Sequence, residues 1–212
     1  MKRKYITHTK QIPYLIVENY FKDEEVDNML SEIKLFDENE LFCFQPGLKM
    51  EEGHKHNTQL GLDKLYAIRQ ASYTLTKLDE IFHDKKLVKK LEDMHWFYDS
   101  WGLTNYDSSF VTKFVEDDYY HEHRDCSVIS WMYWLWEEPK SFSGGDVRLT
   151  DYNIEVPVKR NQLMIFPSSI RHSVNKIENG KGRYCVVRFL HILPANSKVE
   201  SLEGTTIGKG NG

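Results

Sequence analysis

The chain has 212 residues, which is enough for one domain with a substantial hydrophobic core or for a core with an attached helical layer. Hydrophobic residues make up 40% of it and charged residues 28%, as is ordinary for a soluble globular protein. The net charge of −4 gives no electrostatic reason to expect tight nucleic-acid binding.

The N-terminal segment lacks the pattern of a secretion signal or a membrane span. Met1–Lys4 is a basic start of the kind that signal peptides have, but the polar run Thr7–Gln11 follows where an apolar stretch would be needed. Cys43, Cys126 and Cys185 are odd in number and far apart, which suggests neither a disulfide framework nor a zinc knuckle. We therefore expect reduced thiols in a cytoplasmic protein with no membrane contact.

A short strand and a helix are predicted next. Ile12–Val17 is a mostly apolar run that ends at Glu18-Asn19, as is typical of a strand. Asp23 can cap the helix that follows, because its carboxylate can accept hydrogen bonds from the free N–H groups of the first turn. Apolar residues recur at helical spacing in this helix and predict one packed face: Val26, Met29, Leu30, Ile33 and Phe36.

Residues 44–61 predict a loop, because they combine proline, glycines and charges and show no hydrophobic period. A loop of this length in a compact domain is often a lid, so a substrate-covering role is a hypothesis. The loop contains His54-Lys55-His56, and a His-x-His pair can bind a metal when it lies on a strand. A solvated loop is the favoured interpretation.

A helical region follows, from about residue 65 to residue 94. Lys85, Lys86, Lys89 and Lys90 form a basic face of the kind that is usually solvated. The aromatic run from His95 to Gly102 is expected to connect the helices to a sheet. Two apolar stripes predict the packed faces: Leu65, Ile68, Ser72, Leu75, Leu78 and Phe82, then Leu87, Val88, Leu91 and Met94.

From residue 109 onward the pattern changes to short strands separated by turns. The run from Cys126 to Trp136 is nearly continuous in apolar residues, as for a strand covered on both faces. Ser143-Gly144-Gly145 and Pro167-Ser168-Ser169 are typical turns. The other predicted strands are Phe110–Phe114, Asp146–Leu149, Tyr152–Val158, Gln162–Phe166, Ile170–Val174 and Arg183–Ile192.

Many short strands after a helical half predict a mainly β protein with α-helices, in which a barrel or jelly roll is backed by N-terminal helices. We expect one domain over residues 1–212. Its parts are an N-terminal strand with supporting helices (1–108), a β-core (109–193) and a Gly- and Lys-rich tail (204–212) that frays.

Strand alternation predicts which side chains point into the barrel. His172 shares a face with the apolar Ile170 and Val174. On the last strand, Arg183 shares a face with small and ring residues, and Arg188 lies on the opposite face, toward the helices. A buried guanidinium such as that of Arg183 needs an anion.

His123 and Asp125 form a His-x-Asp pair just before a buried strand. With 9 histidines and 32 acidic residues, about one such pair arises by chance (9 × 32/212), and a surface turn is the alternative interpretation. The context favours a metal site, because His172 lies inside a strand 49 positions on (172 − 123). Two histidines and one carboxylate on one side of an ion suit Fe(II) and leave positions open for a cosubstrate and dioxygen.

Two other interpretations of this stretch are weaker. His121 competes as a ligand, and we expect it to be exposed or to lie behind the ligands. The letters His123-Arg124-Asp125 also occur in the catalytic loop of protein kinases. The Gly-rich phosphate loop, strand lysine and Asp-Phe-Gly of a kinase do not accompany them.

Four short motifs follow one another between residues 111 and 191: Tyr119–Asp125, Ser143–Leu149, Gln162–Pro167 leading to His172–Val174, and Gly182–Tyr184. In this order they resemble the 2-oxoglutarate/Fe(II)-dependent dioxygenases, specifically the prolyl-hydroxylase-like branch. The opening Pro13–Val17 with its helix is similar to the N-terminal support of that branch.

The resemblance implies a double-stranded β-helix, or jelly roll, in which His123, Asp125 and His172 bind iron. It implies Arg183 as the partner of the 2-oxoglutarate C5 carboxylate, a task that suits a guanidinium fork. The implied reaction is hydroxylation of an unactivated C–H bond, with dioxygen consumed and succinate and CO2 released, and with ascorbate as a further cofactor. Five residues fall where the family lines its cosubstrate pocket: Met132, Trp134, Val147, Val174 and Phe189.

The chain also departs from the family pattern. Phe114 and Trp134 stand where many members have tyrosines, and we expect Tyr119 or Tyr120 to compensate in binding the cosubstrate. Asn161 stands where the turn usually has glycine, although asparagine tolerates the left-handed region.

The substrate is open at this point. By resemblance it is a prolyl residue in a peptide or protein. A free amino acid, another small molecule and a nucleic acid are alternatives, the last of which would need a basic, aromatic groove beside the iron. A non-catalytic, cupin-like metal-binding module is the alternative from another class, and it would not need Arg183 inside the barrel. Nothing in the sequence indicates the oligomeric state.

Overall fold

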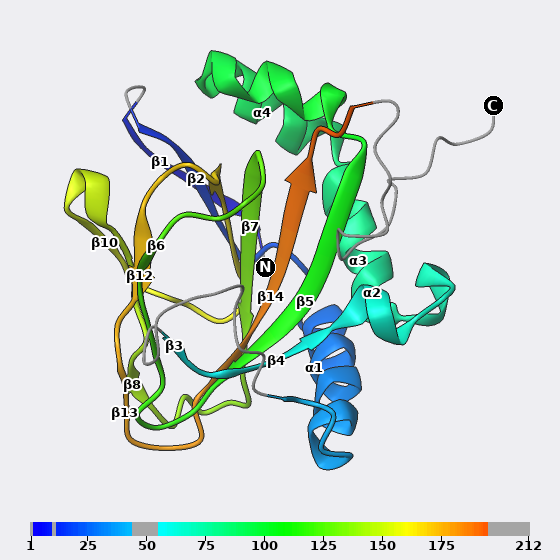
Figure 1. The fold of residues 1–212 in the computed structure, drawn as a ribbon, viewed down its shortest axis with the longest axis vertical. Helices are drawn as coiled ribbons and strands as arrows, with labels where there is room; N and C mark the ends of the chain where they lie inside the picture. Colours follow the sequence, from blue (N-terminus) through cyan, green and yellow to red (C-terminus); the bar gives the residue numbers. More distant parts are fainter. Residues whose placement is uncertain (1, 10–11, 44–54, 195–212) are drawn as a thin grey trace.

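Two antiparallel sheets face each other in the computed structural model, which describes residues 2–9, 12–43 and 55–194 (Figure 1). The large sheet has the strand order β1 (Lys4–Thr9), β2 (Ile12–Glu18), β11 (Gln162–Pro167), β7 (Ile129–Leu135), β14 (Arg183–His191), β5 (Tyr106–Phe114) and β4 (Thr58–Gly61). The small sheet has the order β10 (Ile154–Val156), β9 (Val147–Leu149), β12 (His172–Val174), β6 (Tyr119–His123) and β3 (Lys55–His56). A two-stranded ribbon pairs β8 (Ser143–Gly144) with β13 (Ile177–Glu178). The predicted mainly β jelly roll is thereby confirmed.

The helices cover the face of the large sheet that points away from the small sheet (Figure 1). A hydrophobic core lies between the helices and this face of the sheet. The sheet contributes five fully buried side chains to it: Leu15, Val17, Trp131, Leu163 and Val186. The helices are α1 (Asp23–Glu38), α2 (Leu62–Leu65), α3 (Tyr73–Phe82) and α4 (Lys85–Met94). Three 3-10 turns lie between α2 and α3 (Arg69–Ala71), between α4 and β5 (Trp96–Leu103) and between β9 and β10 (Thr150–Tyr152). The first two of these turns belong to the helical layer, as predicted for a core backed by helices.

A second apolar core lies between the two sheets. β7 contributes to both cores because its side chains alternate: Trp131 and Tyr133 face the helices, whereas Met132 and Trp134 face the small sheet. Every residue of β7 is buried, which confirms the strand with two covered faces predicted from its continuous apolar run. The candidate site occupies this inner space.

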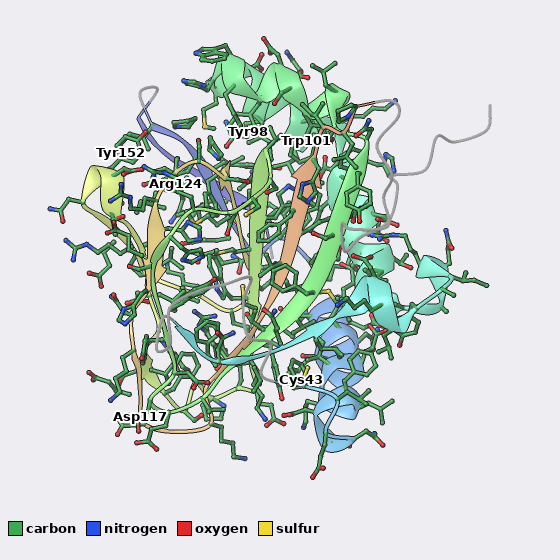
Figure 2. All side chains as sticks on the ribbon, viewed as in Figure 1. Cys43, Tyr98, Trp101, Asp117, Arg124 and Tyr152 are labelled. Atoms are coloured by element: carbon green, nitrogen blue, oxygen red, sulfur yellow. The ribbon has the colours of Figure 1, made fainter. Side chains whose placement is uncertain are left out.

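The aromatic segment after α4 connects the helices to the large sheet, as predicted. Tyr98 donates its hydroxyl proton to the carbonyl of Pro13 at 2.7 Å and lies 3.3 Å from that of Ile165. The ring of Trp101 stacks on Trp131 with centroids 5.4 Å apart. Figure 2 shows Tyr98 and Trp101 below α4, at one end of the sheet.

The N-terminal prediction needs two corrections. β1 was not predicted, because its residues are largely polar and it forms the edge of the large sheet by pairing with β2. Asp23 is the first residue of α1 and not its cap. Lys22 holds the cap position, and the Glu25 carboxylate accepts the Lys22 backbone N–H at 2.8 Å.

The predicted loop over residues 44–61 is wrong at its C-terminal end. Lys55–His56 and Thr58–Gly61 form β3 and β4, which pair with β6 and β5 and thus join both sheets. Short polar strands of this kind lack a hydrophobic period, so they can be recognised only from their pairing with neighbouring strands. The rest of the loop lies outside the described residues, as do the side chains of the His-x-His pair. The lid hypothesis stays a prediction.

The predicted helix stripe is wrong at its start. Leu65 and Ile68 are 40% and 67% exposed, because the helix is broken between Leu65 and Tyr73. Ser72 begins α3 by accepting the Leu75 backbone N–H on its hydroxyl at 3.1 Å. The later stripe positions Leu78 and Leu91 are buried as predicted. None of the helices in the described ranges is both long and apolar enough to cross a membrane.

Candidate metal centre

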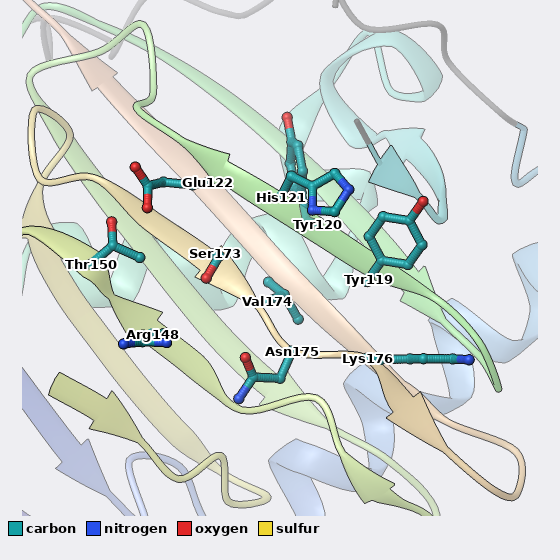
Figure 3. A pocket seen from close by; sticks show the side chains of 10 residues that line it. All are labelled: Tyr119, Tyr120, His121, Glu122, Arg148, Thr150, Ser173, Val174, Asn175 and Lys176. Atoms are coloured by element: carbon teal, nitrogen blue, oxygen red, sulfur yellow. The ribbon is translucent and has the colours of Figure 1, made fainter. Parts of the chain in front are cut away.

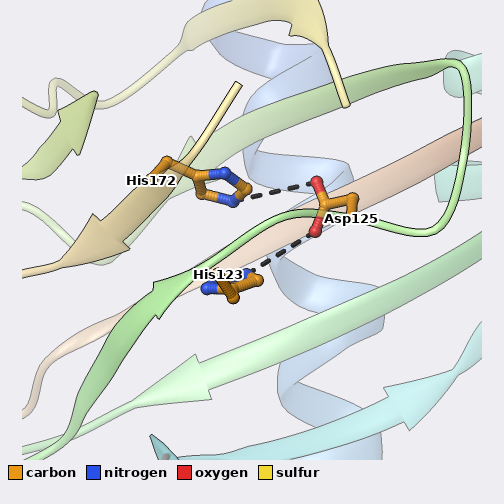
Figure 4. Close-up of side chains that lie close together, drawn as sticks. All are labelled: His123, Asp125 and His172. Carbon is orange, nitrogen blue, oxygen red and sulfur yellow. Dashed lines mark ion pairs between the residues drawn. The ribbon is translucent and has the colours of Figure 1, made fainter. Parts of the chain in front are cut away.

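His123, Asp125 and His172 come together between the two sheets, at the ends of two paired strands (Figure 4). His172 begins β12 and lies directly opposite His123, the last residue of β6. Asp125 Oδ1 lies 3.5 Å from His123 Nε2, and Asp125 Oδ2 lies 3.7 Å from His172 Nε2. One ligand atom from each residue lies within 4.8 Å of the other two, so one ion can contact all three.

Asp125 does not share a strand with His123. β6 ends at His123, and Asp125 lies in the turn that leads to β7. The Asp125 backbone N–H donates to the carbonyl of Ser168 at 3.1 Å, which holds the turn against the end of β11. The carboxylate therefore reaches the histidines through this turn and not through strand alternation.

A β-bulge in β6 decides which tyrosine faces the site. His172 pairs with His123 and Val174 pairs with Tyr120, so three steps on β6 (123 − 120) match two on β12 (174 − 172). The extra residue puts Tyr120 on the inner face, where its ring stacks on His123 with centroids 3.7 Å apart. Tyr119 instead lies beside His121, with ring centroids 4.7 Å apart. The structure thus favours Tyr120 over Tyr119 as the neighbour of the triad, and the bulge is the reason that Tyr120 faces inward.

Both histidine rings are held in the tautomer that a metal ligand needs. His123 Nδ1 lies 2.8 Å from the carbonyl of His121, and His172 Nδ1 lies 3.0 Å from the carbonyl of Ile170. A carbonyl only accepts, so each Nδ1 must carry the proton and each Nε2 keeps a lone pair toward the centre. His121 thus acts behind the ligands through its backbone, while its side chain is exposed.

The charges suit a divalent cation. Burial lowers the pKa of His172 below its usual value, and the neighbouring Asp125 offsets this only in part, which favours a neutral imidazole. Burial alone would raise the pKa of Asp125, but the two histidines and the Ser130 hydroxyl outweigh burial and hold that pKa below its usual value. His172 Nε2 is buried without a hydrogen-bond partner among the described residues. Two imidazole nitrogens and one carboxylate oxygen form a donor set that fits Fe(II).

Arg183 is buried in the same space, on the inner face of β14. It is 2% exposed, and its Nη2 donates to the carbonyl of Gly145 at 2.8 Å. Its Nε and Nη1 have no hydrogen-bond partner in the described part of the chain. The guanidinium lies 4.9 Å from the Phe114 ring centroid and 6.0 Å from that of Trp134, the two rings that replace the usual tyrosines. A buried cation with two open donors needs an anion, which fits a dicarboxylate cosubstrate.

The remaining predicted pocket residues lie in the core between the sheets. Trp134 and Val147 are fully buried, and Phe189 is partly buried against them. The indole N–H of Trp134 has no hydrogen-bond partner within the described residues. Met132 and Val174 complete the set and are 8% and 7% exposed. These positions share the inner space with the triad and Arg183, and their contact with a cosubstrate stays a prediction.

The sequence interpretation missed a set of serines behind Asp125. Ser130 Oγ lies 2.5 Å from Asp125 Oδ2, and Ser168 and Ser127 continue the contact. The only sequence signal was a serine inside the otherwise apolar strand Ile129–Leu135.

An open groove of about 540 Å³ lies over β6, β9 and β12 (Figure 3). Polar and charged side chains such as His121, Glu122, Arg148 and Lys176 line it, and Tyr119 lies at one edge. The triad residues and Arg183 are not among its lining residues, but Tyr120, whose ring stacks on His123, and the predicted pocket residue Val174 are.

Comparison with known proteins gives a family match for the segment that holds the site. Residues 104–191 match the sequence model of the 2OG-Fe(II) oxygenase superfamily. None of the curated proteins matches the chain. The matched segment contains the triad, Arg183 and all five predicted pocket residues, and it supports the resemblance that the four motifs carry.

Solved structures of prolyl hydroxylases share the fold. A Pseudomonas putida prolyl-4-hydroxylase superposes with a TM-score of 0.61 at 15% sequence identity, covering 86% of this chain and 94% of its own. A Trichoplax adhaerens prolyl hydroxylase, solved with a peptide fragment of the hypoxia inducible factor oxygen degradation domain, gives a TM-score of 0.61 at 12% identity and covers 85% and 84%. The viral collagen prolyl hydroxylase of Paramecium Bursaria Chlorella virus-1, in complex with 2OG, gives 0.54 at 12% identity and covers 85% and 96%.

Proposed function

We propose that this chain, whose residues 104–191 belong to the 2OG-Fe(II) oxygenase superfamily, hydroxylates an unactivated C–H bond of a prolyl residue in a peptide or protein. The observation that carries the proposal is a pairing of two features in one inner space. A triad of two histidines and one carboxylate lies between the sheets, and a buried guanidinium with open donors lies on the inner face of β14. A metal-binding module would need only the first feature.

In this proposal His123, Asp125 and His172 hold the ion, each through one atom. The carbonyls of His121 and Ile170 keep the two imidazoles oriented. Bound there, Fe(II) would supply the oxygen activation that couples decarboxylation of 2-oxoglutarate to hydroxylation, with release of succinate and CO2.

Arg183 would orient the cosubstrate by pairing with the carboxylate remote from the metal. Its Nε and Nη1 offer two donors, and the rings of Phe114 and Trp134 lie beside the guanidinium. Apolar side chains such as Val147 and Val174 would exclude water from the space around it. Tyr120, whose pKa burial raises to about 12, stays protonated there and could donate a hydrogen bond.

The prolyl substrate rests on likeness. The superposed structures include prolyl hydroxylases, and one of them was solved with a peptide. Ascorbate, as the reductant that keeps the iron ferrous, belongs to the same proposal. The net charge of −4 gives no support to nucleic acid as the substrate.

Anaerobic spectroscopy tests the cosubstrate site before any substrate is known. Fe(II) and then 2-oxoglutarate are added to the metal-free protein, and the visible spectrum is recorded. We expect a weak charge-transfer band that needs both additions and is weakened in Arg183→Ala. Arg171→Ala is the matched control, because that arginine is 43% exposed and pairs with Glu122 on the surface.

Iron binding without the band in the wild-type protein would refute the oxygenase proposal and favour a metal-binding jelly roll. If the band forms, succinate release with proline-containing peptides, free amino acids and oligonucleotides tests the substrate. Release with peptides alone is the expected result.

A further inference from the structure

Three serine hydroxyls form a chain of contacts that ends at the Asp125 carboxylate; we refer to Ser127, Ser168 and Ser130 as the serine chain. Ser127 Oγ lies 2.5 Å from Ser168 Oγ, and Ser168 Oγ lies 2.8 Å from Ser130 Oγ. Ser130 Oγ lies 2.5 Å from Asp125 Oδ2. Ser130 and Ser168 are fully buried. The three residues come from the turn before β7, from β7 itself and from the turn after β11.

Proton counting fixes the direction of every bond in the serine chain. A carboxylate only accepts, so Ser130 donates its single proton to Asp125. Ser130 can then only accept from Ser168, so Ser168 donates to Ser130. Ser127 must therefore donate to Ser168, and its 3.4 Å contact with the carbonyl of Ile129 is the weaker alternative. Hydroxyls aligned in one direction polarise one another, which strengthens the last bond, the one to Asp125.

The main chain holds the same carboxylate from the other side. The Asp125 backbone N–H donates to the carbonyl of Ser168 at 3.1 Å, and the Ser168 N–H donates to the carbonyl of Val128 at 3.0 Å. Ser168 thus contacts the turn of Asp125 through its backbone and, through Ser130, the carboxylate of Asp125. Asp125 lies beyond the end of β6, where no hydrogen bonds between paired strands hold its backbone. The contacts with Ser168 hold it instead.

We propose that Ser130 is a positioning residue for the metal ligand Asp125: it occupies Oδ2 and leaves Oδ1, the oxygen that faces His123, for the ion. Ser168 and Ser127 set the direction of the Ser130 hydroxyl. This inference rests on the proposed function, because it assumes that Asp125 binds the metal. A carboxylate oxygen that already accepts a hydrogen bond is a poorer metal donor than a free one, so the serine selects one oxygen and one side-chain rotamer.

Co(II) is the probe for the test, since its visible d–d bands report both binding and coordination. Metal-free wild-type protein, Ser130→Ala, Ser130→Thr, Ser168→Ala and Ser127→Ala are titrated with Co(II) without oxygen or cosubstrate. We expect the dissociation constant to rise about tenfold or more in Ser130→Ala, with altered d–d bands. Ser130→Thr keeps the hydroxyl and should restore both the affinity and the bands, which a purely structural loss would not do.

The serines farther from Asp125 provide a graded control. Ser168→Ala should weaken binding less than Ser130→Ala, and Ser127→Ala least, because each is one bond farther from the carboxylate. Thermal unfolding of each metal-free variant shows whether it is folded. If Ser130→Ala does not fold, the half-buried Ser127 still tests the chain through its effect on the bands.

Two failures are distinguishable. If Ser130→Ala binds Co(II) with wild-type affinity and unchanged bands, the role of Ser130 is refuted and the metal assignment stands. If the wild-type protein itself shows no d–d bands that His172→Ala removes, the metal assignment falls, and the serine inference falls with it.

Discussion

Arg183 and Arg188 lie on opposite faces of β14, and both are almost completely buried, but only Arg188 is paired with carboxylates. Arg188 Nε lies 2.8 Å from Asp107 Oδ2, and Arg188 Nη1 lies 2.9 Å from Asp79 Oδ1. Both contacts are close ion pairs, although neither counts as a hydrogen bond. Arg183 forms no ion pair within the described ranges, and burial lowers its pKa below the usual value. One arginine therefore stabilises the fold, and the other is available to a ligand.

The first prediction is that methionine at these two positions has opposite effects on stability. Arg188→Met leaves Asp107, which is fully buried, without its closest cation, and should lower the free energy of unfolding by about 3–5 kcal/mol. Arg183→Met removes an unpaired buried charge and should leave the free energy of unfolding unchanged or raise it by about 1 kcal/mol or more. Urea unfolding of the ligand-free proteins measures both values.

Arg171→Met is the surface control for this pair, because an exposed ion pair with Glu122 contributes less than about 1 kcal/mol. Equal destabilisation by Arg183→Met and Arg188→Met would contradict the division of roles. A stable Arg183→Met protein that still binds 2-oxoglutarate like the wild type would contradict the cosubstrate assignment alone.

Hydrophobic periodicity predicted the helices and strands whose buried face is marked by regularly spaced apolar residues. The apolar stripe of α1, the two-faced β7 and the inward set on β14 are where the sequence indicated, because burial of one face fixes the register. The strands β1, β3 and β4 were missed because they are short or polar and depend on partners distant in sequence. The break between Leu65 and Tyr73 was missed because the apolar spacing continues across it.

For the candidate site, the types and spacing of the residues were a better guide than the strand geometry expected from the sequence. His123, Asp125 and His172 were selected from the His-x-Asp pattern and the family resemblance, and the structure brings them together. The bulge that exchanges Tyr119 for Tyr120 has no local sequence signal, since it exists only in the pairing with β12. The serine chain could not be predicted from the sequence either, because its members come together only when β7 and β11 pair.

The second prediction concerns Gly145, whose backbone shapes the space around Arg183. Its φ is +73°, and a Cβ there would lie 2.3 Å from Ile177 Cδ1 and 3.3 Å from Arg183 Nε. Gly145→Ala should therefore displace the guanidinium and weaken 2-oxoglutarate binding about tenfold, which corresponds to about 1.4 kcal/mol. Anaerobic calorimetry of the Fe(II)-loaded protein measures the dissociation constant. Gly102→Ala, with nothing within 4 Å of the added carbon, should bind as the wild type does.

The third prediction separates a ligand from the residue behind it. Asp125→Ala should abolish hydroxylation and weaken Fe(II) binding by about a hundredfold or more, because the only carboxylate of the triad is lost. His121→Ala should change iron affinity little, since the carbonyl that orients His123 belongs to the backbone and survives the substitution. Iron titration and succinate release measure the two effects. Full activity of Asp125→Ala would show that the ligand assignment is wrong.

The fourth prediction is a dependence of stability on pH that comes from Asp63. This residue belongs to a cluster of ion pairs with Arg69, Asp79, Asp107 and Arg188. Its Oδ1 lies 2.5 Å from Arg69 Nη1, and its Oδ2 accepts the Ser109 backbone N–H. Burial, together with the nearby Asp107, raises the pKa of Asp63 from 3.8 to about 6. The folded protein therefore binds a proton at Asp63 more tightly than the unfolded chain does.

Because the folded-state pKa is the higher one, the proton stabilises the folded state, and this contribution is complete below pH 3.8 and is lost as the pH rises to about 6. Asp63→Asn removes the titration. The free energy of unfolding of the wild type, relative to this variant, should thus fall by up to roughly 3 kcal/mol across that interval. Urea unfolding at a series of pH values gives the difference directly.

Asp84→Asn is a control of opposite sign. Burial opposes ionisation of Asp84, but hydrogen bonds from the Leu87 backbone N–H, Tyr20 and Arg3 outweigh burial and hold its pKa below the usual value. Its contribution is therefore present above the usual pKa and is lost as the pH falls, so the wild type should gain stability over Asp84→Asn as the pH rises. Differences that change in the same direction for both variants would contradict the assignment of the Asp63 shift to burial beside Asp107.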